Sequence, residues 1–261
     1  MTEAGEASSP HEASETHLSL VVPAFNEEHR IADSMRRIGA YLASLPYACE
    51  VIGVDDGSAS AGRQALEASL EALPRTLARG LVRHDMNRGK GAAVRTGALA
   101  ASGRYVAFID ADLATPPEEL AQLVAALDAG ADVVVGVRNQ PDGSDMRDRR
   151  SLPRRLAGKT YAMFMRRLLM PDIRDSQCPL KAFRREAAHR LFSLQRIETW
   201  AFDAELLFLA RKLGLRVQQV PVSWRAVEGS RFQFSLRRAT ELLNLLRIRW
   251  WHRGVRSGRG A

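Results

Sequence analysis

Two pairs of acidic residues follow short apolar runs, and their side chains could bind a metal ion or hydroxyl groups. Asp110 and Asp112 lie one residue apart in IDADL, directly after the run RYVAF. Two carboxylates on such a turn can converge on a hard divalent cation, which would bridge a diphosphate. Asp55 and Asp56, in VDDGS, follow the run EVIGV and could accept hydrogen bonds from a base N–H or ribose hydroxyls. Each pair taken alone is also typical of a solvated turn.

A glycine-containing segment, NRGKG at 87–91, precedes a stretch of small residues that predicts a helix. Backbone N–H groups and the positive end of the helix dipole, together with Arg88 and Lys90, could bind a phosphate there. The chain contains neither GxGxxG nor GxxxxGK[ST]. Without these patterns a dinucleotide oxidoreductase and a P-loop NTPase are both disfavoured.

These polar residues are set in a regular alternation of strand-like and helix-like segments. Strands are predicted at 18–23, 50–55, 79–84, 104–110 and 131–137, with helices between them at 27–45, 64–73, 92–101 and 116–127. The alternation predicts an α/β fold with a doubly wound, mainly parallel sheet, which binds ligands beyond the carboxyl ends of its strands. Polar residues follow four of these ends: Asn26 and Glu27, Asp55 and Asp56, Asp110 and Asp112, and Arg138.

The rest of the chain has a less regular pattern. A basic stretch at 141–155 precedes an amphipathic segment, Leu156–Met170, and then a strand at 180–185, a helix at 202–213, a strand at 215–224 and a C-terminal helix, Leu236–Trp251. Residues 1–17 are small, polar and acidic, which predicts a disordered tail. We therefore expect this tail, one α/β domain over 18–229, and a C-terminal loop with an amphipathic, membrane-associating helix over 230–261.

Four segments in this order resemble motifs of the inverting family 2 glycosyltransferases of GT-A fold: VVPAFNEE, VDDGS, NRGKGAA and DADLATPP. In the second half, RDSQCPLKAFRREAAHRLF, ETWAFDAELLFLA and VSWRAVEGSRF are similar to segments of the dolichyl-phosphate β-glucosyltransferases and of bacterial polyprenyl-phosphate glycosyltransferases. The resemblance covers roughly Leu18 to Trp251. It implies a GT-A, Rossmann-like sheet and the transfer of a sugar from a nucleotide donor.

The resemblance also implies three groups of site residues, for the nucleoside, the sugar diphosphate and the acceptor phosphate. The nucleoside group is Pro23, Ala24, Glu27 and Asp55, with Lys90 near the donor. The catalytic group is Asp110 and Asp112, which would hold Mg²⁺ or Mn²⁺ at the diphosphate, and Asp203 at the sugar. The acceptor and diphosphate group is Arg138 and Arg150, with Ser230 and Arg231 on a loop that could close over the diphosphate.

A lipid phosphate is ionised at neutral pH, so it can attack the anomeric carbon while a metal and cations stabilise the departing nucleoside diphosphate. Because no proton must be removed, two roles stay open for Asp203: a general base, or a carboxylate that binds hydroxyls or a helix N-terminus. One position departs from the family pattern. Relatives of the dolichyl-phosphate mannose synthase type have Gln two residues after the second Asp, where this chain has Ala114, which implies fewer metal ligands and disfavours mannose.

The expected reaction is inverting transfer of one hexose, with UDP-glucose favoured as donor, to a polyprenyl or dolichyl phosphate. GDP-mannose and a UDP-N-acetylhexosamine stay open as donors, because sugar choice depends on pocket shape. A nucleic-acid-binding protein is a remoter alternative that would explain the formal charge of +8. We expect no nucleic-acid partner, because acidic pairs at one sheet edge repel phosphate unless a metal intervenes. A scaffold that binds the donor without turnover is disfavoured by the intact acidic pair.

A lipid acceptor implies a membrane, yet no apolar run in the chain reaches the roughly 18 to 20 residues of a spanning helix. The segment Leu236–Trp251 mixes Leu, Ile and Trp with four Arg, a composition typical of an interfacial helix, and Leu156–Met170 is similar. Two helices packed on the domain are the alternative. With two Cys and no signal-peptide pattern, we expect a cytoplasmic protein held peripherally at the cytoplasmic face of the membrane.

Overall fold

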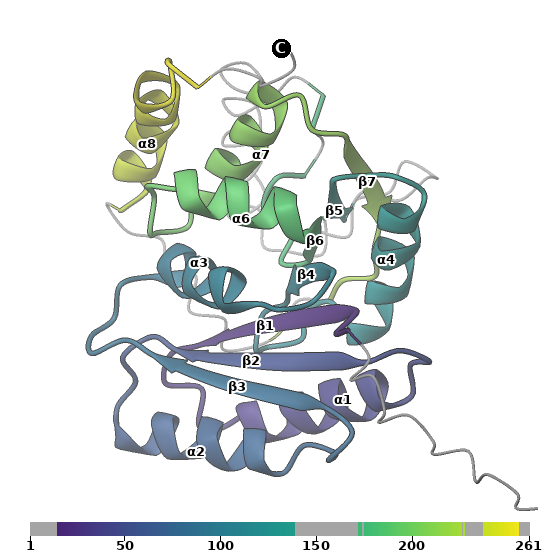
Figure 1. The fold of residues 1–261 in the computed structure, drawn as a ribbon. Coiled ribbons are helices and arrows are strands. Elements are labelled where there is room, and N and C mark those ends of the chain that lie inside the picture. Colours follow the sequence, from purple (N-terminus) through teal and green to yellow (C-terminus); the bar gives the residue numbers. More distant parts are fainter. Residues whose placement is uncertain (1–14, 139–171, 174, 226, 228–236, 256–261) are drawn as a thin grey trace, which may run out of the picture.

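The computed structural model describes residues 15–138, 172–173, 175–225, 227 and 237–255, and its centre is a seven-stranded sheet (Figure 1). The strands lie in the order β3-β2-β1-β4-β6-β5-β7. Their bounds are β1 Leu18–Ala24, β2 Cys49–Asp55, β3 Ala78–Arg83, β4 Tyr105–Phe108, β5 Val133–Val137, β6 Lys181–Arg184 and β7 Val217–Pro221. All seven strands that the sequence predicts are therefore present, and they belong to one sheet.

The sheet is mainly parallel, as the sequence predicts, with one strand reversed. β1 pairs in parallel with β2 and β4, β2 with β3, and β5 with β7, while β6 runs antiparallel to both β4 and β5. Phe108, the last residue of β4, is paired with Lys181, the first residue of β6. The start of β6 therefore lies at the same edge of the sheet as the carboxyl ends of β1, β2 and β4.

Helices cover both faces of this sheet, which makes it doubly wound. One face carries α1 Ile31–Ala43, α2 Ser60–Glu71 and α4 Leu120–Asp128, and the other carries α3 Lys90–Ala100, α6 Arg185–Leu194, α7 Phe202–Lys212 and α8 Arg237–Trp251. A short 3-10 turn, η1 Pro117–Glu119, precedes α4.

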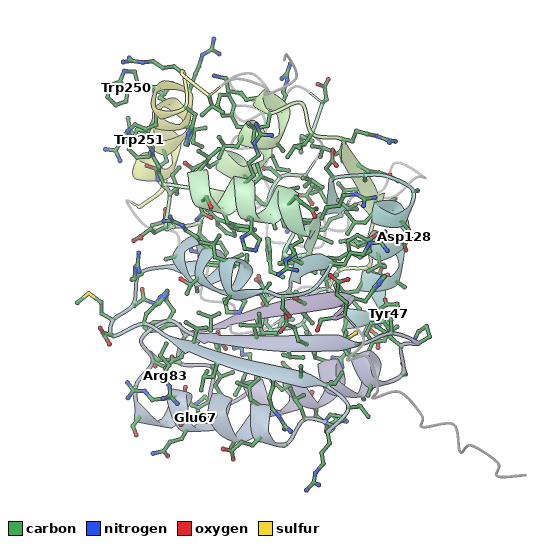
Figure 2. The ribbon with its side chains drawn as sticks, in the orientation of Figure 1. Tyr47, Glu67, Arg83, Asp128, Trp250 and Trp251 are labelled. Atoms are coloured by element: carbon green, nitrogen blue, oxygen red, sulfur yellow. The ribbon has the colours of Figure 1, made fainter. Side chains whose placement is uncertain are left out.

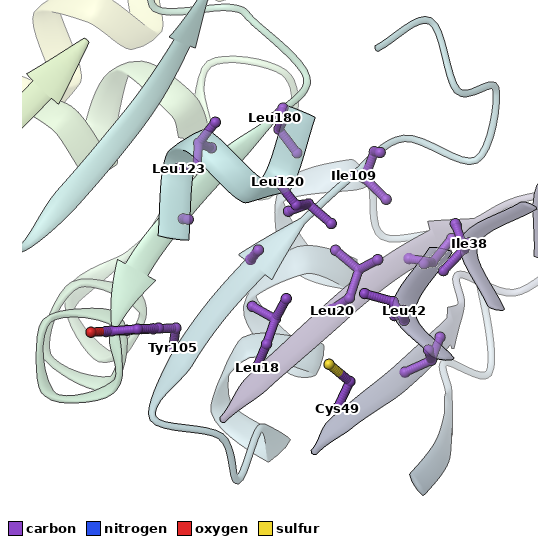
Figure 3. Close-up of a cluster of buried hydrophobic side chains, with 14 of the residues drawn as sticks. Leu18, Leu20, Ile38, Leu42, Cys49, Tyr105, Ile109, Leu120, Leu123 and Leu180 are labelled. Atoms are coloured by element: carbon purple, nitrogen blue, oxygen red, sulfur yellow. The ribbon is translucent and has the colours of Figure 1, made fainter. Parts of the chain in front are cut away.

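Each buried strand supplies both hydrophobic cores, because successive side chains of a strand point to opposite faces. In β1, Leu20 belongs to the core under α1, α2 and α4, and Val21 to the core under α3, α6 and α7. Figure 3 shows the first core, in which Leu20 lies among Ile38 and Leu42 of α1 and Leu120 of α4. Fully buried strands of this kind appear as continuous apolar runs, which is how they are recognised in the sequence.

Several helices begin at positions other than those predicted, among them α2 at Ser60 rather than 64, and two of them show a local reason. The first begins at Ile31 rather than 27, since the carbonyl of Glu27 accepts the backbone N–H groups of Arg30 (3.0 Å) and Ile31 (2.9 Å) in a turn. The third begins at Lys90 rather than 92 and follows Gly89, which has φ of +113°. That backbone conformation favours glycine and directs the chain into the helix.

The start of the domain lies slightly ahead of Leu18. His17 donates its backbone N–H to the carbonyl of Ala48 at 2.8 Å, and the carbonyl of Thr16 accepts the N–H of Arg104 at 2.9 Å. Residues 16 and 17, expected to belong to the tail, thus already bind the residues that precede β2 and β4. Residues 1–14 of the expected tail lie outside the described residues.

The C-terminal helix α8 packs on α7 with one of its sides. Ile248 is fully buried in the core that α7 helps to form. Lys212, at the end of α7, donates from Nζ to the carbonyl of His252 at 2.8 Å, and Figure 1 shows the two helices beside each other. A helix is thus present at Arg237–Trp251, within the segment expected to form one, and it contacts the domain.

Another side of α8 exposes large apolar side chains. Leu243, Leu246 and Trp250 have exposed fractions of 50%, 54% and 62%, and Figure 2 shows Trp250 projecting away from the rest of the molecule. Their spacing of three and four residues places them on one stripe of the helix. Within the described ranges, no helix has the length and apolar character needed to cross a membrane. The other expected amphipathic segment, Leu156–Met170, lies outside those ranges.

Candidate active site

The residues expected at the nucleoside come together at the carboxyl ends of β1 and β2. Pro23 and Ala24 end β1, and the strand register pairs Ala24 with Asp55, the last residue of β2. Glu27 follows β1 after a turn in which Asn26 has φ of +51°. The parallel pairing of β1 and β2 is what brings these residues, separated by about thirty positions in the chain, to one edge of the sheet.

Asp55 is buried and only partly satisfied by the residues around it. Its Oδ1 accepts the backbone N–H of Ser58 at 2.9 Å. Among the described residues its Oδ2 accepts no hydrogen bond, although Arg63 Nε lies 3.6 Å away. A buried carboxylate oxygen with spare acceptor capacity suits a ribose hydroxyl or a base N–H.

Asp56 anchors the loop that leads to Lys90, a role that the sequence does not reveal. Its carboxylate contacts His84 Nδ1 at 2.7 Å and accepts hydrogen bonds from Asn87 Nδ2 at 2.9 Å and from the backbone N–H groups of Arg88 (3.0 Å) and Gly89 (2.8 Å). No role was expected for His84. The sequence offers one clue to this role, because VDDGS and NRGKG both occur in the chain. Only the fold shows that Asp56 of the first segment fixes the second by hydrogen bonds.

Lys90 and the acidic pair meet where α3 begins and β4 ends. Lys90 Nζ lies 2.5 Å from Asp110 Oδ1. In the turn after Asp110, the N–H of Leu113 donates to the Asp110 carbonyl at 3.1 Å, and Ala114 N–H donates to Asp112 Oδ1 at 3.0 Å. Leu113 has φ of +46°, an uncommon conformation for a branched residue and a sign of a constrained turn.

The two carboxylates have the chemistry of a divalent-cation site. Burial raises the pKa of Asp112, and the neighbouring charge of Asp110 raises it further. Burial by itself lowers the pKa of Lys90, but the charges of Asp110 and Asp203 outweigh it, so that this pKa is raised. Like charges held together in a partly buried turn favour an added cation, and oxygen donors suit Mg²⁺ or Mn²⁺. The residues present therefore fit such a metal.

Asp203 lies at the start of α7 in an ion pair with Lys181, a lysine for which the sequence predicts no role. Lys181 Nζ is 2.6 Å from Asp203 Oδ1, and both side chains are buried. Burial raises the pKa of Asp203, while the charges of Lys181 and Lys90 oppose that shift. A lysine inside the apolar strand LKAF indicates a buried charge. Its partner lies 22 residues further along the chain, so the sequence alone does not identify the pair.

Arg138 directly follows β5, as expected, and it is held by an aspartate. Its Nε and Nη2 donate to Asp175 at 2.6 and 2.7 Å, and its guanidinium lies 5.6 Å from the ring centroid of Trp224. This buried, two-point ion pair gives Arg138 a structural role, whether or not it also meets the acceptor. Arg150, Ser230 and Arg231, the other residues expected at the phosphates, lie outside the described residues.

An acidic D-x-D turn and Lys90 sit at the carboxyl edge of a mainly parallel α/β sheet, the arrangement expected of a GT-A glycosyltransferase, and the comparisons show that the chain is a glycosyltransferase. Residues 19–192 match the family model described as glycosyl transferase family 2, and the chain belongs to that family. Individual relatives indicate a more specific group of enzymes within this family. The dolichyl-phosphate β-glucosyltransferase of Dictyostelium discoideum is 33% identical over 243 residues, which cover 88% of this chain and 73% of the relative. The enzyme of the same description from Drosophila melanogaster is 36% identical over 225 residues, covering 82% and 68%.

The comparison with solved structures agrees on the fold. Glucosyl-3-phosphoglycerate synthase from Mycobacterium tuberculosis, in complex with Mn²⁺, UDP and glucosyl-3-phosphoglycerate, superposes with a TM-score of 0.64 at 23% identity, over 95% of this chain and 83% of that one. The expected GT-A architecture is therefore confirmed.

Proposed function

We propose that this chain transfers one glucose from UDP-glucose to a polyprenyl phosphate such as dolichyl phosphate, with inversion at the anomeric carbon. The observation that carries the proposal is the similarity to dolichyl-phosphate β-glucosyltransferases along more than four fifths of the chain. Ala114, in place of the glutamine of mannose synthase relatives, favours glucose over mannose. The nucleoside would bind at Pro23, Ala24, Glu27 and Asp55.

Asp110 and Asp112 would hold a divalent metal, Mg²⁺ or Mn²⁺. When bound, that metal supplies positive charge that stabilises the departing nucleoside diphosphate. Proteins commonly bind such an ion with only two carboxylate ligands, since substrate phosphates and water complete its coordination. Lys90, paired with Asp110 at 2.5 Å, adds a fixed positive charge at the same place.

The acceptor phosphate requires no general base, because it is already ionised at neutral pH. One of its oxygens forms the bond to the anomeric carbon, and the bond from that carbon to the diphosphate oxygen breaks, so no proton is transferred. Arg150 and Arg138 are our proposed contacts of the acceptor phosphate, and Ser230 and Arg231 of the diphosphate. Arg138 would act with its ion pair to Asp175 in place.

We also propose that the protein is held peripherally at the cytoplasmic face of the membrane by α8. The stripe of Leu243, Leu246 and Trp250 would enter the headgroup region, while Arg247 and Arg249 on the same helix would meet anionic lipid. All five of these side chains are exposed. The side of α8 that carries Ile248 is occupied by the domain, so the helix would lie on the membrane with its outer side.

The test is a panel of radiolabelled donors incubated with polyprenyl phosphate and Mn²⁺ or Mg²⁺, followed by extraction of labelled lipid. We expect label from UDP-glucose in the lipid phase, and none without the metal. Label from GDP-mannose or UDP-N-acetylglucosamine instead would contradict the donor. A parallel reaction with 3-phosphoglycerate, the acceptor part of the product bound in the structural neighbour, tests the acceptor, since glucosylation of that soluble phosphate alone would exclude a lipid substrate.

A further inference from the structure

Lys181 is buried with no exposed surface, and the reaction described above assigns it no role. Its Nζ lies 2.6 Å from Asp203 Oδ1, 2.8 Å from the carbonyl oxygen of Cys178 and 5.5 Å from the ring centroid of Phe108. Lysine is almost never fully buried unless it is paired, because removing an ammonium from water is strongly unfavourable. As the first residue of β6 it is paired with Phe108, the last residue of the strand that leads into the acidic turn.

Lys90 is paired with one carboxylate and lies within the electrostatic influence of a second. It makes its close ion pair with Asp110, and the charges of Asp110 and Asp203 both act on its ammonium group. Its Nζ lies 5.9 Å from the ring centroid of Phe108, the same ring that Lys181 faces. Lys90 and Lys181 thus lie around one aromatic ring, and Asp203 is within the electrostatic reach of both.

We propose that Lys181 is a positioning residue for donor binding: by neutralising Asp203, it leaves Lys90 to pair with Asp110 and to face the diphosphate of the nucleotide sugar. This inference rests on the proposed nucleotide-sugar function. If Lys181 lost its charge, the buried carboxylate of Asp203 would draw Lys90 away from the acidic turn. Asp203 is then part of the fixed wall of the site and not a general base.

The surroundings of Asp203 agree with this assignment. A general base must reach the atom whose proton it takes, but Asp203 is 2% exposed and its Oδ1 is engaged by Lys181. The proposed acceptor, an ionised phosphate, has no proton to give. A buried carboxylate with a dedicated lysine is better explained as an element that sets the charge around its neighbours.

A double-mutant cycle on Lys90 and Lys181 tests the coupling through nucleotide binding, without turnover. The wild type is titrated calorimetrically with UDP and with GDP, in Mn²⁺ and in EDTA, and the nucleotide that binds is used for the variants. We expect Lys90→Met and Lys181→Met each to weaken binding about tenfold, and the double variant to be no weaker than Lys90→Met. Independent, multiplying effects of about a hundredfold in the double variant, or no effect of Lys181→Met alone, would overturn the proposal.

Asp203→Asn supplies the second arm. In the Lys181→Met background it should restore nucleotide affinity to within about threefold of wild type, because no buried carboxylate is left to compete for Lys90. It also covers the case in which Lys181→Met alone does not fold, since the doubly substituted protein leaves no unpaired buried charge. A folded double variant that binds nucleotide normally, yet loses more than about a hundredfold in kcat together with one ionisation of the pH profile, would instead make Asp203 the base.

Tyr105→Phe is the matched control. Tyr105 is buried at the other end of β4, and its hydroxyl donates to Asp128 at 2.6 Å. Removal of this hydroxyl should lower the melting temperature and leave the nucleotide affinity unchanged, both in the wild-type protein and in the Lys90→Met variant. Binding of GDP but not UDP would contradict the proposed donor and keep this test intact, whereas binding of neither nucleotide would overturn both proposals.

Discussion

Glu205 Oε1 of α7 lies 2.6 Å from Nε2 of His252, just beyond α8, and both side chains are buried. The same carboxylate accepts the backbone N–H groups of Arg196 at 3.0 Å and Ile197 at 2.8 Å. One acidic side chain therefore joins the C-terminal helix to the segment that precedes α7. This explains why α8 is fixed to the domain although part of its surface is apolar and exposed.

Replacement of Glu205 by Gln should loosen α8. The amide nitrogen of Gln cannot accept the hydrogen bonds that the second carboxylate oxygen now accepts, and leaving buried donors unsatisfied costs about 1 to 3 kcal/mol. Denaturant unfolding of the full chain measures this decrease in the free energy of unfolding. Glu186→Gln, at an exposed position of α6, is the control and should be nearly neutral. Equal stability of the two variants would show that the Glu205 contacts contribute little.

Asp112→Asn should abolish transfer while the protein stays folded. The asparagine oxygen can still accept the N–H of Ala114, which Asp112 accepts at 3.0 Å, but one negative ligand of the metal is lost. We expect at least a roughly hundredfold fall in lipid labelling at saturating Mn²⁺, with an unchanged melting temperature. The control is Asp33→Asn on the exposed surface of α1. Near-normal product from Asp112→Asn would remove the metal role.

Arg138→Ala and Arg150→Ala should each raise the KM for polyprenyl phosphate more than the KM for the donor, because charge-assisted contacts with phosphate contribute about 1.5 to 3 kcal/mol. The two variants should differ in their free energy of unfolding. Arg138→Ala removes the buried ion pair to Asp175, and breaking a buried ion pair costs about 3 to 5 kcal/mol. Steady-state kinetics measures the effect on each KM, and thermal unfolding measures the effect on stability. A rise in the KM for the donor instead would show that these arginines bind the nucleotide sugar and not the acceptor.

Replacement of Leu243, Leu246 and Trp250 by Ser or Gln should abolish co-sedimentation with anionic liposomes and preserve nucleotide binding. The stripe is exposed, so these changes leave the core intact, and attachment of the wild type should weaken in high salt because exposed charges are screened. Met86→Ser removes an apolar side chain that is even more exposed, at 70%, and far from α8 in the chain, and this variant should sediment as wild type does. Unchanged sedimentation of the triple variant would show that this side of α8 does not bind the membrane.

The two cysteines should be unreactive in the native protein. Burial raises the pKa of the Cys49 and Cys178 thiols to about 11, so on the order of 0.1% of each is ionised at pH 8. Because the folded pKa lies above the unfolded value, the thiols favour unfolding as the pH rises from about 9. A thiol reagent at pH 8 should label both cysteines only after denaturation, and rapid labelling of native protein would contradict this.

Much of the site could be predicted from the chain alone, for a geometrical reason. Short apolar runs alternating with helices predict parallel strands, and parallel strands bring their carboxyl ends to one edge. Asp55 and Asp110 each follow such a run, so their proximity needs no knowledge of packing. Motif order then identified the family. The buried strands also show themselves as continuous apolar runs, because both faces of the sheet are covered.

Tertiary structure alone decided which charges pair. Lys181 reaches Asp203 because β6 enters the sheet antiparallel beside β4, and strand partners distant in the chain are chosen by packing across the whole core. Arg138 meets Asp175 for the same reason, 37 residues apart. In α8 the composition indicates an apolar side, but only the packing of Ile248 shows which side the domain covers. Local sequence sets periodicity and turn chemistry, whereas long-range contacts depend on how all the elements fill one volume.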